Sequence, residues 1–294
     1  MKSVLGNSNQ YLTIIYAKKD KFWLIIWSGI IGFIAVWDFL FLNKPAFKLV
    51  IEGFRNTVVI STLVVLFSFL LGWLIALLIV RLESARLHFP YLLLTFILNS
   101  IRSIPQIVGI LLGYIGITYL IETNFITSSW IVIVSMALVI SIFIFSEMID
   151  LIRERIEHFK KLDFYNAMKV CGISENRIIN FDILWKNSRI HILNKLIAIF
   201  GSAIFLQCTI DFIISVGLST QVSSVNFPVT LGSLLAKIDS KQDILAIGTT
   251  LTNPSYFSHI FFEHLQGITV AFLIVFTLVC IYKISSGFAE RNRI

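Results

Sequence analysis

Leu162–Asn187 reads LDFYNAMKVCGISENRIINFDILWKN, and this stretch decides how the rest of the chain is interpreted. It is polar, it has a glycine near its centre, and long apolar runs lie on both sides of it. A chain that only has to turn back on itself needs a handful of residues for the turn. The polar segment is much longer than that, so we interpret it as a docking surface.

The apolar runs around this segment predict a membrane protein built from helices. Of the 294 residues, 57% are hydrophobic and 14% are charged, and the mean hydropathy is +0.86. Several runs reach about 20 residues, the length that crosses a bilayer as a helix. The runs are uninterrupted rather than alternating, which favours helices over a transmembrane barrel. The predicted fold class is therefore an all-α membrane protein.

Six membrane spans are predicted in one membrane domain. The first apolar run is longer than the core of a secretory signal and lacks a small-residue cleavage site, so it is interpreted as an uncleaved span. Residues 1–56 hold a leader, the first span and a short external segment, and residues 57–294 hold a core of five spans. The expected spans are 22–42, 57–80, 91–121, 130–148, 192–219 and 265–284.

The distribution of Lys and Arg predicts the orientation of the spans. With the N-terminus inside, 18 of the 24 basic residues fall on the inner side, five fall outside, and Arg102 lies within a span. Basic residues are retained on the cytoplasmic side, so both termini are expected there. The same distribution accounts for the net charge of +7 without a nucleic-acid partner.

Two loops stand out in this topology. The inner loop covers residues 149–191, between spans four and five. The outer loop covers residues 220–264, where LGSLLAKI predicts a short amphipathic helix near the membrane and the rest is either a site for an external partner or a plain surface loop.

The inner loop has the pattern of an elbow between helices. Ile152, Ile156 and Phe159 recur at helical spacing, so span four is expected to continue beyond the membrane. A second piece, Asp163–Val170, ends before Gly172, which suits the left-handed conformation past a helix end. Ser174 then stands at an N-cap position. The third piece is expected to expose an apolar edge formed by Ile178, Ile179 and Ile183. A solvated amphipathic hairpin on the membrane surface fits this pattern as well.

The inner loop also resembles the EAA loop of permeases from binding-protein-dependent ABC importers. The residues in step with that motif are Asp163, Phe164, Ala167, Lys169, Gly172, Ser174, Arg177, Ile178, Ile179, Ile183 and Leu184. Four positions depart from it: Asn166 replaces a glutamate, Met168 an alanine, Asp182 a histidine and Trp185 a proline.

In that family the loop seats in a cleft on a cytoplasmic ATPase subunit. The resemblance therefore implies an ATPase-coupling loop here, with Asn166–Gly172 as its central contact. The candidate coupling residues are Asp163, Asn166, Ala167, Met168, Gly172, Ser174, Arg177, Ile179 and Leu184.

Further segments extend the likeness over roughly residues 54–294. NSIRSIPQIVGILL is similar to the family's R-x-I-P segment, and the tail GFAERNRI is similar to a longer family ending. ISVGLS followed by NFPVTLGSLLAKI resembles a pattern of the dipeptide, oligopeptide and nickel permeases. There Gly217, Leu218, Gly232, Leu234 and Leu235 match, while Ser219 and Leu231 stand in for a glycine and a tryptophan.

Polar residues inside the spans are candidates for a translocation path. An arginine at membrane depth is costly unless it faces protein or water, and a proline leaves helix carbonyls free. Arg102, Pro105, Asp211 and Gly217 are therefore assigned to the path. In the alternative, Arg102 is paired with a carboxylate, for which Asp211 is a candidate, or extends to the membrane surface.

No catalytic or metal site is expected. The five histidines form no metal-binding spacing, the three cysteines form no CxxC motif, and GxxxxGK[ST] is absent. We predict that this chain is not an enzyme and binds no cofactor, with ATP and Mg²⁺ on partner ATPase subunits.

The resemblance implies a permease subunit of a type I ABC importer in the bacterial inner membrane, for peptides or a similar small solute. Its implied partners are a second homologous permease, two cytoplasmic ATPases, an extracytoplasmic solute-binding protein and membrane lipid. Two alternatives remain open. One is an ion-coupled secondary transporter or channel with Arg102 and Asp211 as its polar path, and the other is a degenerate permease-like scaffold or sensor.

Overall fold

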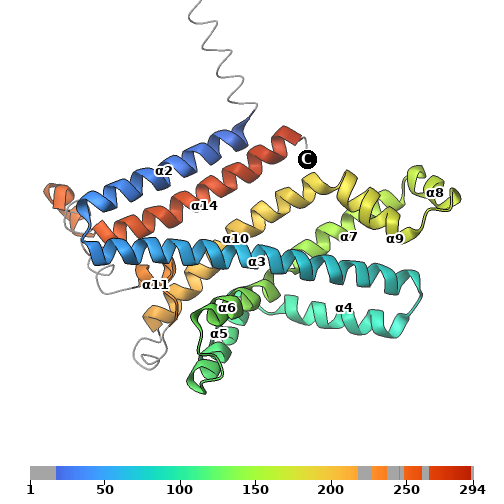
Figure 1. Ribbon diagram of the computed structural model, residues 1–294, viewed down its shortest axis with the longest axis horizontal. Helices are drawn as coiled ribbons and strands as arrows, with labels where there is room; N and C mark the ends of the chain where they lie inside the picture. Colours follow the sequence, from blue (N-terminus) through green and yellow to red (C-terminus); the bar gives the residue numbers. More distant parts are fainter. Residues whose placement is uncertain (1–17, 218–226, 237–244, 246–247, 260–264, 293–294) are drawn as a thin grey trace, which may run out of the picture.

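The computed structural model describes residues 18–217, 227–236, 245, 248–259 and 265–292. All regular structure in these ranges is helical (Figure 1). The helices on the N-terminal side are α2 (Lys19–Phe41), α3 (Lys44–Ser84), α4 (His88–Ser103), α5 (Gln106–Glu122), α6 (Ser129–Ile144) and α7 (Ser146–Lys160). They are followed by α8 (Asp163–Val170), α9 (Glu175–Arg177), the π-helix η1 (Ile178–Asn187), α10 (Arg189–Gly217), α11 (Leu231–Leu235), the 3₁₀ turn η2 (Pro254–Tyr256) and α14 (Leu265–Asn292).

Four helices are long and apolar enough to cross a membrane, namely α2, α3, α10 and α14. Two further pairs meet the same criterion together but are bent, α4–α5 by 96° and α6–α7 by 46°. Counting each bent pair as one span gives six, the number that the apolar runs predict.

Helix α3 differs from the expected layout. The sequence analysis places residues 43–56 in a short external segment before the second span, but residues 44–56 are the first part of α3, which has 41 residues. At 1.5 Å per residue such a helix is about 60 Å long, twice the roughly 30 Å hydrocarbon core of a bilayer. The amphipathic start and the apolar span are therefore one continuous rod.

The predicted third span, 91–121, is a pair of helices broken at Pro105, and the pair meets the criterion for a membrane span only when taken together. Helix α4 ends at Ser103, Ile104 is extended with ψ 126°, and α5 begins after Pro105. Proline has no N–H and its ring excludes the preceding residue from the helical region, so the break falls where the chemistry requires it. The fourth span does continue past its apolar part, through α7 to Lys160, but with a bend at Phe145 that the sequence did not indicate.

The helices pack around α3 and α10. Helix α3 contacts α6, α7 and α10, while α14 lies between α2 and α10 (Figure 1). One apolar core joins α3, α5, α6, α7, η1 and part of α10. A second, smaller core joins α11, α14, the start of α3 and part of α10.

Helix α11 forms where the sequence predicts a short helix, but it is buried rather than lying on the membrane surface. Leu231 and Leu234 are 2% and 0% exposed. A side chain at Gly232 would clash with the backbone of Cys208 on α10, so only glycine permits this close approach. The rest of the predicted external loop, including 218–226 and 237–244, lies outside the described residues.

Candidate functional site

The elbow between α8 and α9 is built on a glycine, as the sequence predicts. Gly172 has φ +79°, a left-handed conformation. Its N–H donates to the Lys169 carbonyl at 3.0 Å, and the Ile173 N–H donates to the Met168 carbonyl at 3.1 Å. These two bonds form a Schellman cap, which ends α8 and redirects the chain within three residues.

The third piece of the elbow differs from the prediction in two ways. Ser174 stands at the N-cap position of α9, but its side chain makes no capping bond. The helix that follows Arg177 is a ten-residue π-helix, η1. The expectation that Ile178, Ile179 and Ile183 form an exposed edge is wrong, since they are 0%, 5% and 0% exposed.

The spacing of the apolar residues in η1 accounts for this burial. Ile178 and Ile179 recur five residues later as Ile183 and Leu184, and all four are buried. Hydrogen bonds between residues five apart bring such positions onto nearly the same face, whereas an α-helix would separate them. The π-helix thus turns the whole apolar set toward the core, against α7.

A single carboxylate holds the elbow together. Glu175 Oε1 accepts from the Tyr165 hydroxyl at 2.8 Å and lies 3.3 Å from Lys160 Nζ. Its other oxygen lies 4.0 Å from Lys169 Nζ, and the same ammonium sits over the Tyr165 ring. Glu175 therefore joins the end of α7, the buried side of α8 and the start of α9.

These contacts also shift the pKa values of Tyr165 and Glu175. Burial, the hydrogen bond to Glu175 and its negative charge raise the pKa of Tyr165 to about 12, so its hydroxyl stays a donor at neutral pH. Burial alone would raise the pKa of Glu175, but the Tyr165 hydroxyl and the two lysines outweigh it and lower that pKa from 4.5. Glu175 is therefore ionised at neutral pH.

The elbow is tied to the rest of the molecule at two more places. Arg81, in the last turn of α3, donates to Asn176 Oδ1 at 3.2 Å. The side chains of Met168 and Ile173 pack against the larger core. The elbow is thus fixed in orientation, while Asn166, Ala167 and Val170 on α8 are exposed.

The predicted coupling residues divide into an exposed and a buried group. Met168 is half-buried, and Ile179 and Leu184 lie in the core, where they support the elbow. The remaining six are exposed: Asp163, Asn166, Ala167, Gly172, Ser174 and Arg177. The sequence analysis missed Tyr165, Glu175 and Lys160, which hold the elbow, and Val170, which is 89% exposed at its tip. An apolar residue between Lys169 and Cys171 was the available signal for Val170.

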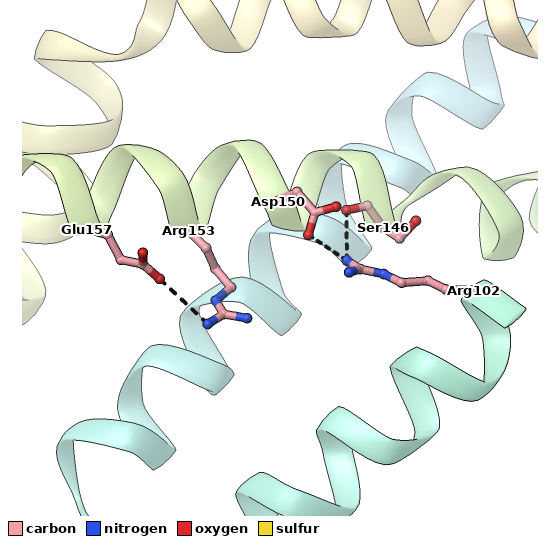
Figure 2. A network of polar contacts seen from close by, with 5 residues as sticks. All are labelled: Arg102, Ser146, Asp150, Arg153 and Glu157. Atoms are coloured by element: carbon pink, nitrogen blue, oxygen red, sulfur yellow. Dashed lines mark hydrogen bonds and ion pairs between the residues drawn. The ribbon is translucent and has the colours of Figure 1, made fainter.

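Arg102 and Pro105 lie where the two bent spans meet. Arg102, in the last turn of α4, donates to Asp150 Oδ1 at 2.6 Å and to the Ser146 carbonyl at 3.3 Å, as Figure 2 shows. Beyond Pro105, Gln106 donates to the Phe143 carbonyl at 3.1 Å. The break in one span is therefore bonded to carbonyls on both sides of the bend in the other.

Asp211 is not the partner of Arg102, contrary to the suggestion from sequence. It is 5% exposed and accepts from the Thr230 hydroxyl at 2.6 Å, so it anchors the segment that leads into α11. Tyr114 and Gln207 are buried beside it. Gly217 is the last residue of α10. Of the four path residues, the structure brings together only Arg102 and Pro105.

An exposed polar strip surrounds this pair. Between positions 99 and 106, every residue except Ile101 is exposed, and the strip's polar members are Asn99, Ser100, Arg102, Ser103 and Gln106. Polar side chains within membrane spans face water or protein rather than lipid. The strip therefore contains the residues from which a channel wall or a subunit contact could be built.

Within the described ranges, no group of three or more His, Cys, Asp or Glu side chains is arranged to hold a metal ion. Cys171 is free and exposed, and Cys208 and Cys280 are free and buried.

No protein-family model matches this chain, and no curated protein matches it. Among solved structures, it is similar to one described as the crystal structure of an amino acid ABC transporter with histidines. The sequence identity is 18% and the TM-score is 0.47, over 84% of this chain and 94% of that one. At this distance the likeness decides neither family nor function.

Proposed function

We propose that the chain is a permease subunit of an ATP-driven ABC importer and that the α8 elbow is its contact with a cytoplasmic ATPase. The observation that supports this most is the construction of the elbow. Glu175 and the Gly172 cap hold α8 in one orientation, while Asn166 and Val170 remain exposed on its outer side. A lever that passes force to the spans has to be fixed at its base and open at its tip.

The spans supply the second part of the proposal. The elbow joins α7 directly, and α7 is bonded through Asp150 to Arg102 at the break between α4 and α5. A displacement of α8 thus reaches the polar strip through one continuous helix. The strip then lines half of the translocation path, and the other half belongs to a second, homologous permease subunit.

The remaining components follow from the resemblance of the inner loop to the EAA loop. Two ATPases bind ATP and Mg²⁺ and dock on the elbow and its counterpart. Both termini lie in the cytoplasm of a bacterium, the spans lie in its inner membrane, and a solute-binding protein delivers a peptide or a similar small solute from outside.

Site-directed photo-crosslinking tests the docking. A benzoylphenylalanine at Val170 of the full chain in native membranes should form an adduct with an ATPase that carries a phosphate loop. Leu251 offers a matched control, because it is 83% exposed but belongs to the segment between α11 and α14, which is expected on the opposite side of the membrane. Adducts to the ATPase from both positions, or from neither, would refute the assignment.

Reconstitution separates this function from the alternatives. Liposomes that hold this chain, the ATPase identified by crosslinking and the second permease should take up solute only when ATP is present. Uptake by this chain alone, driven by an ion gradient, would establish the secondary transporter instead. Binding of the ATPase without any transport would favour the scaffold.

A further inference from the structure

Helices α2 and α14 lie side by side and enclose a groove of about 390 Å³ (Figure 1). Its walls hold four aromatic side chains together with isoleucines from both helices: Phe33, Trp37, Phe272 and Phe276, with Ile30, Ile34 and Ile268. The lining has one polar side chain, Thr269, whose hydroxyl is bonded to Asp38 at 3.0 Å. The groove is therefore apolar over its whole accessible surface.

The described part of the chain leaves this groove open. Phe33 and Phe272 are 66% and 46% exposed. Helix α2 packs chiefly against α14, and only 6% of its most apolar window is buried. A second hollow of about 280 Å³ continues the apolar surface along α14, through Phe272, Val275 and Phe276. Because both helices are membrane spans, hydrocarbon chains are the surrounding solvent.

Charge at one end of the groove distinguishes it from other lipid-facing surface. The groove lies in the last turns of α2 and the first turns of α14, so it opens toward the end where α3 begins. Lys44 and Lys48 stand there on one face of α3, four residues apart, and both are exposed. No ion pair joins either lysine to a carboxylate in the described ranges.

The distance between the groove and the lysines suits a phospholipid. From Trp37 to Lys44 the chain runs through one helical turn and three further residues, which span at most about 17 Å. Half the thickness of a bilayer core is about 15 Å. A phosphate at the lysines can therefore have its acyl chain against Trp37.

We propose that the groove between α2 and α14 binds one acyl chain of an anionic phospholipid, with its phosphate held by Lys44 and Lys48. Each lysine near a membrane surface enriches anionic lipid there by about a factor of five. The lipid head group held by the lysines brings its acyl chain to the groove, and the groove orders that acyl chain. The inference depends only on the chain crossing a membrane and not on the proposed role in an importer.

Quenching of Trp37 by brominated lipid tests the proposal. The full chain is reconstituted in phosphatidylcholine vesicles that contain a minor fraction of acyl-brominated phosphatidylglycerol, and the Trp37→Phe variant isolates the signal of this residue. Trp37 should be quenched as if the anionic lipid were enriched roughly 25-fold over its bulk fraction, about fivefold for each lysine. Acyl-brominated phosphatidylcholine at the same fraction should show no enrichment.

Two variants decide what causes the enrichment. Lys44→Gln with Lys48→Gln should return quenching to the bulk fraction, and because both lysines are exposed the fold is retained. Ile34→Phe, which narrows the groove, should lower quenching by the anionic lipid while the lysines stay in place. Equal quenching by both lipids, or enrichment that survives the double lysine change, would show adventitious annular lipid only. A Trp37 that no lipid quenches would assign the groove to a helix of another subunit and overturn the proposal.

Discussion

Glu175 is the residue on which the elbow most depends, because one carboxylate bonds groups from two other helical segments. Its contacts with Tyr165 and Lys160 cross from α9 to α8 and α7. The carboxylate is one-third exposed, so we expect these contacts to stabilise the elbow by only about 1 kcal/mol. That is enough to set the orientation of α8, a segment of about two turns, though not the fold of the molecule.

The lowered pKa of Glu175 gives this stabilisation a pH dependence. Because the pKa is lower in the folded elbow than its ordinary 4.5, the stabilisation is fully present above that value and is lost as the pH falls through the lowered pKa. Amide hydrogen exchange of α8, corrected for the intrinsic rate, should therefore lose about fivefold protection between neutral pH and about pH 3. Glu175→Gln should lack that protection at neutral pH. Equal protection in the two proteins at neutral pH would contradict this role of Glu175.

Gly172 permits a residue-scale test of coupling. A side chain there meets nothing within 4 Å, so any penalty comes from the φ of +79° and not from packing. Gly172→Val should cost about 1–2 kcal/mol in the elbow, while Gly172→Asn should cost less because asparagine tolerates the left-handed region. We expect the valine variant to insert normally. In the reconstituted transporter that contains it, the partner ATPases should hydrolyse ATP but no solute should be transported. Normal transport by the valine variant would count against the coupling assignment.

At the scale of the elements, the two bent spans are the main departure from a simple bundle. The break at Pro105 and the bend at Phe145 lie against each other, bridged by Arg102 and Gln106. Helix α3 approaches the same point closely, because a side chain at Gly72 would lie 2.6 Å from the Met148 Cβ. The bends therefore meet at a single close-packed point.

This close approach predicts a large effect from a small change. Gly72→Val overpacks the contact between α3 and α7, and we expect it to destabilise the protein by about 1–3 kcal/mol. Gly116→Val is the matched control, because Gly116 is also in a helix within a span but a side chain there meets nothing within 4 Å. Thermal unfolding of both variants in the same detergent measures the difference. Similar melting temperatures would show that α3 and α7 separate easily.

At the scale of the whole molecule, α2 depends mainly on one neighbouring helix. Its principal contact is with α14, and two ion pairs join the ends of these helices. Lys19 lies 2.7 Å from Glu290, and Arg291 lies 2.7 Å from Asp20. The Asp20 side chain is only 9% exposed. Breaking the Arg291–Asp20 pair should therefore destabilise the protein more than breaking the Lys19–Glu290 pair.

Removing one partner of this pair should release α2. Arg291→Gln leaves a buried carboxylate without its cation, and we expect a loss of about 2 kcal/mol. The loss should appear as a longer and broader distance between spin labels at Ser28 and Tyr282, measured by pulsed electron resonance. Exchanging the charges, with Asp20→Arg and Arg291→Asp, should restore the narrow distribution. An unchanged distribution in Arg291→Gln would show that apolar contacts alone hold α2.

Much of this arrangement could be predicted from sequence because it depends on local patterns. Apolar runs marked the four long helices and two bent pairs that are candidate membrane spans, and helical spacing marked the continuation through α7. Gly172 marked the end of α8, since few other residues adopt its conformation. These signals act within one or two turns of helix, where neighbouring residues dominate.

The parts that could not be predicted depend on residues far apart in the chain. The sequence analysis named Asp211 as a candidate partner of Arg102, but the bends of α4–α5 and α6–α7 bring Asp150 to it instead. Tyr165 and Lys160 become a site only when Glu175 folds back between them. Ile178, Ile179 and Ile183 of η1 were expected on the surface. An α-helix would have placed residues five apart on different faces, whereas the π-helix places them on nearly the same face.

The polar elbow at Leu162–Asn187 shows both kinds of determination. The sequence by itself determined that a helix, a glycine turn and a second helical piece follow span four, because capping and helical periodicity are local. Only the tertiary structure decided which face of that elbow is open, since burial of Ile178 and Ile183 requires the core of α7 to be present. The groove between α2 and α14 is likewise a product of packing, because its two walls come from opposite ends of the chain.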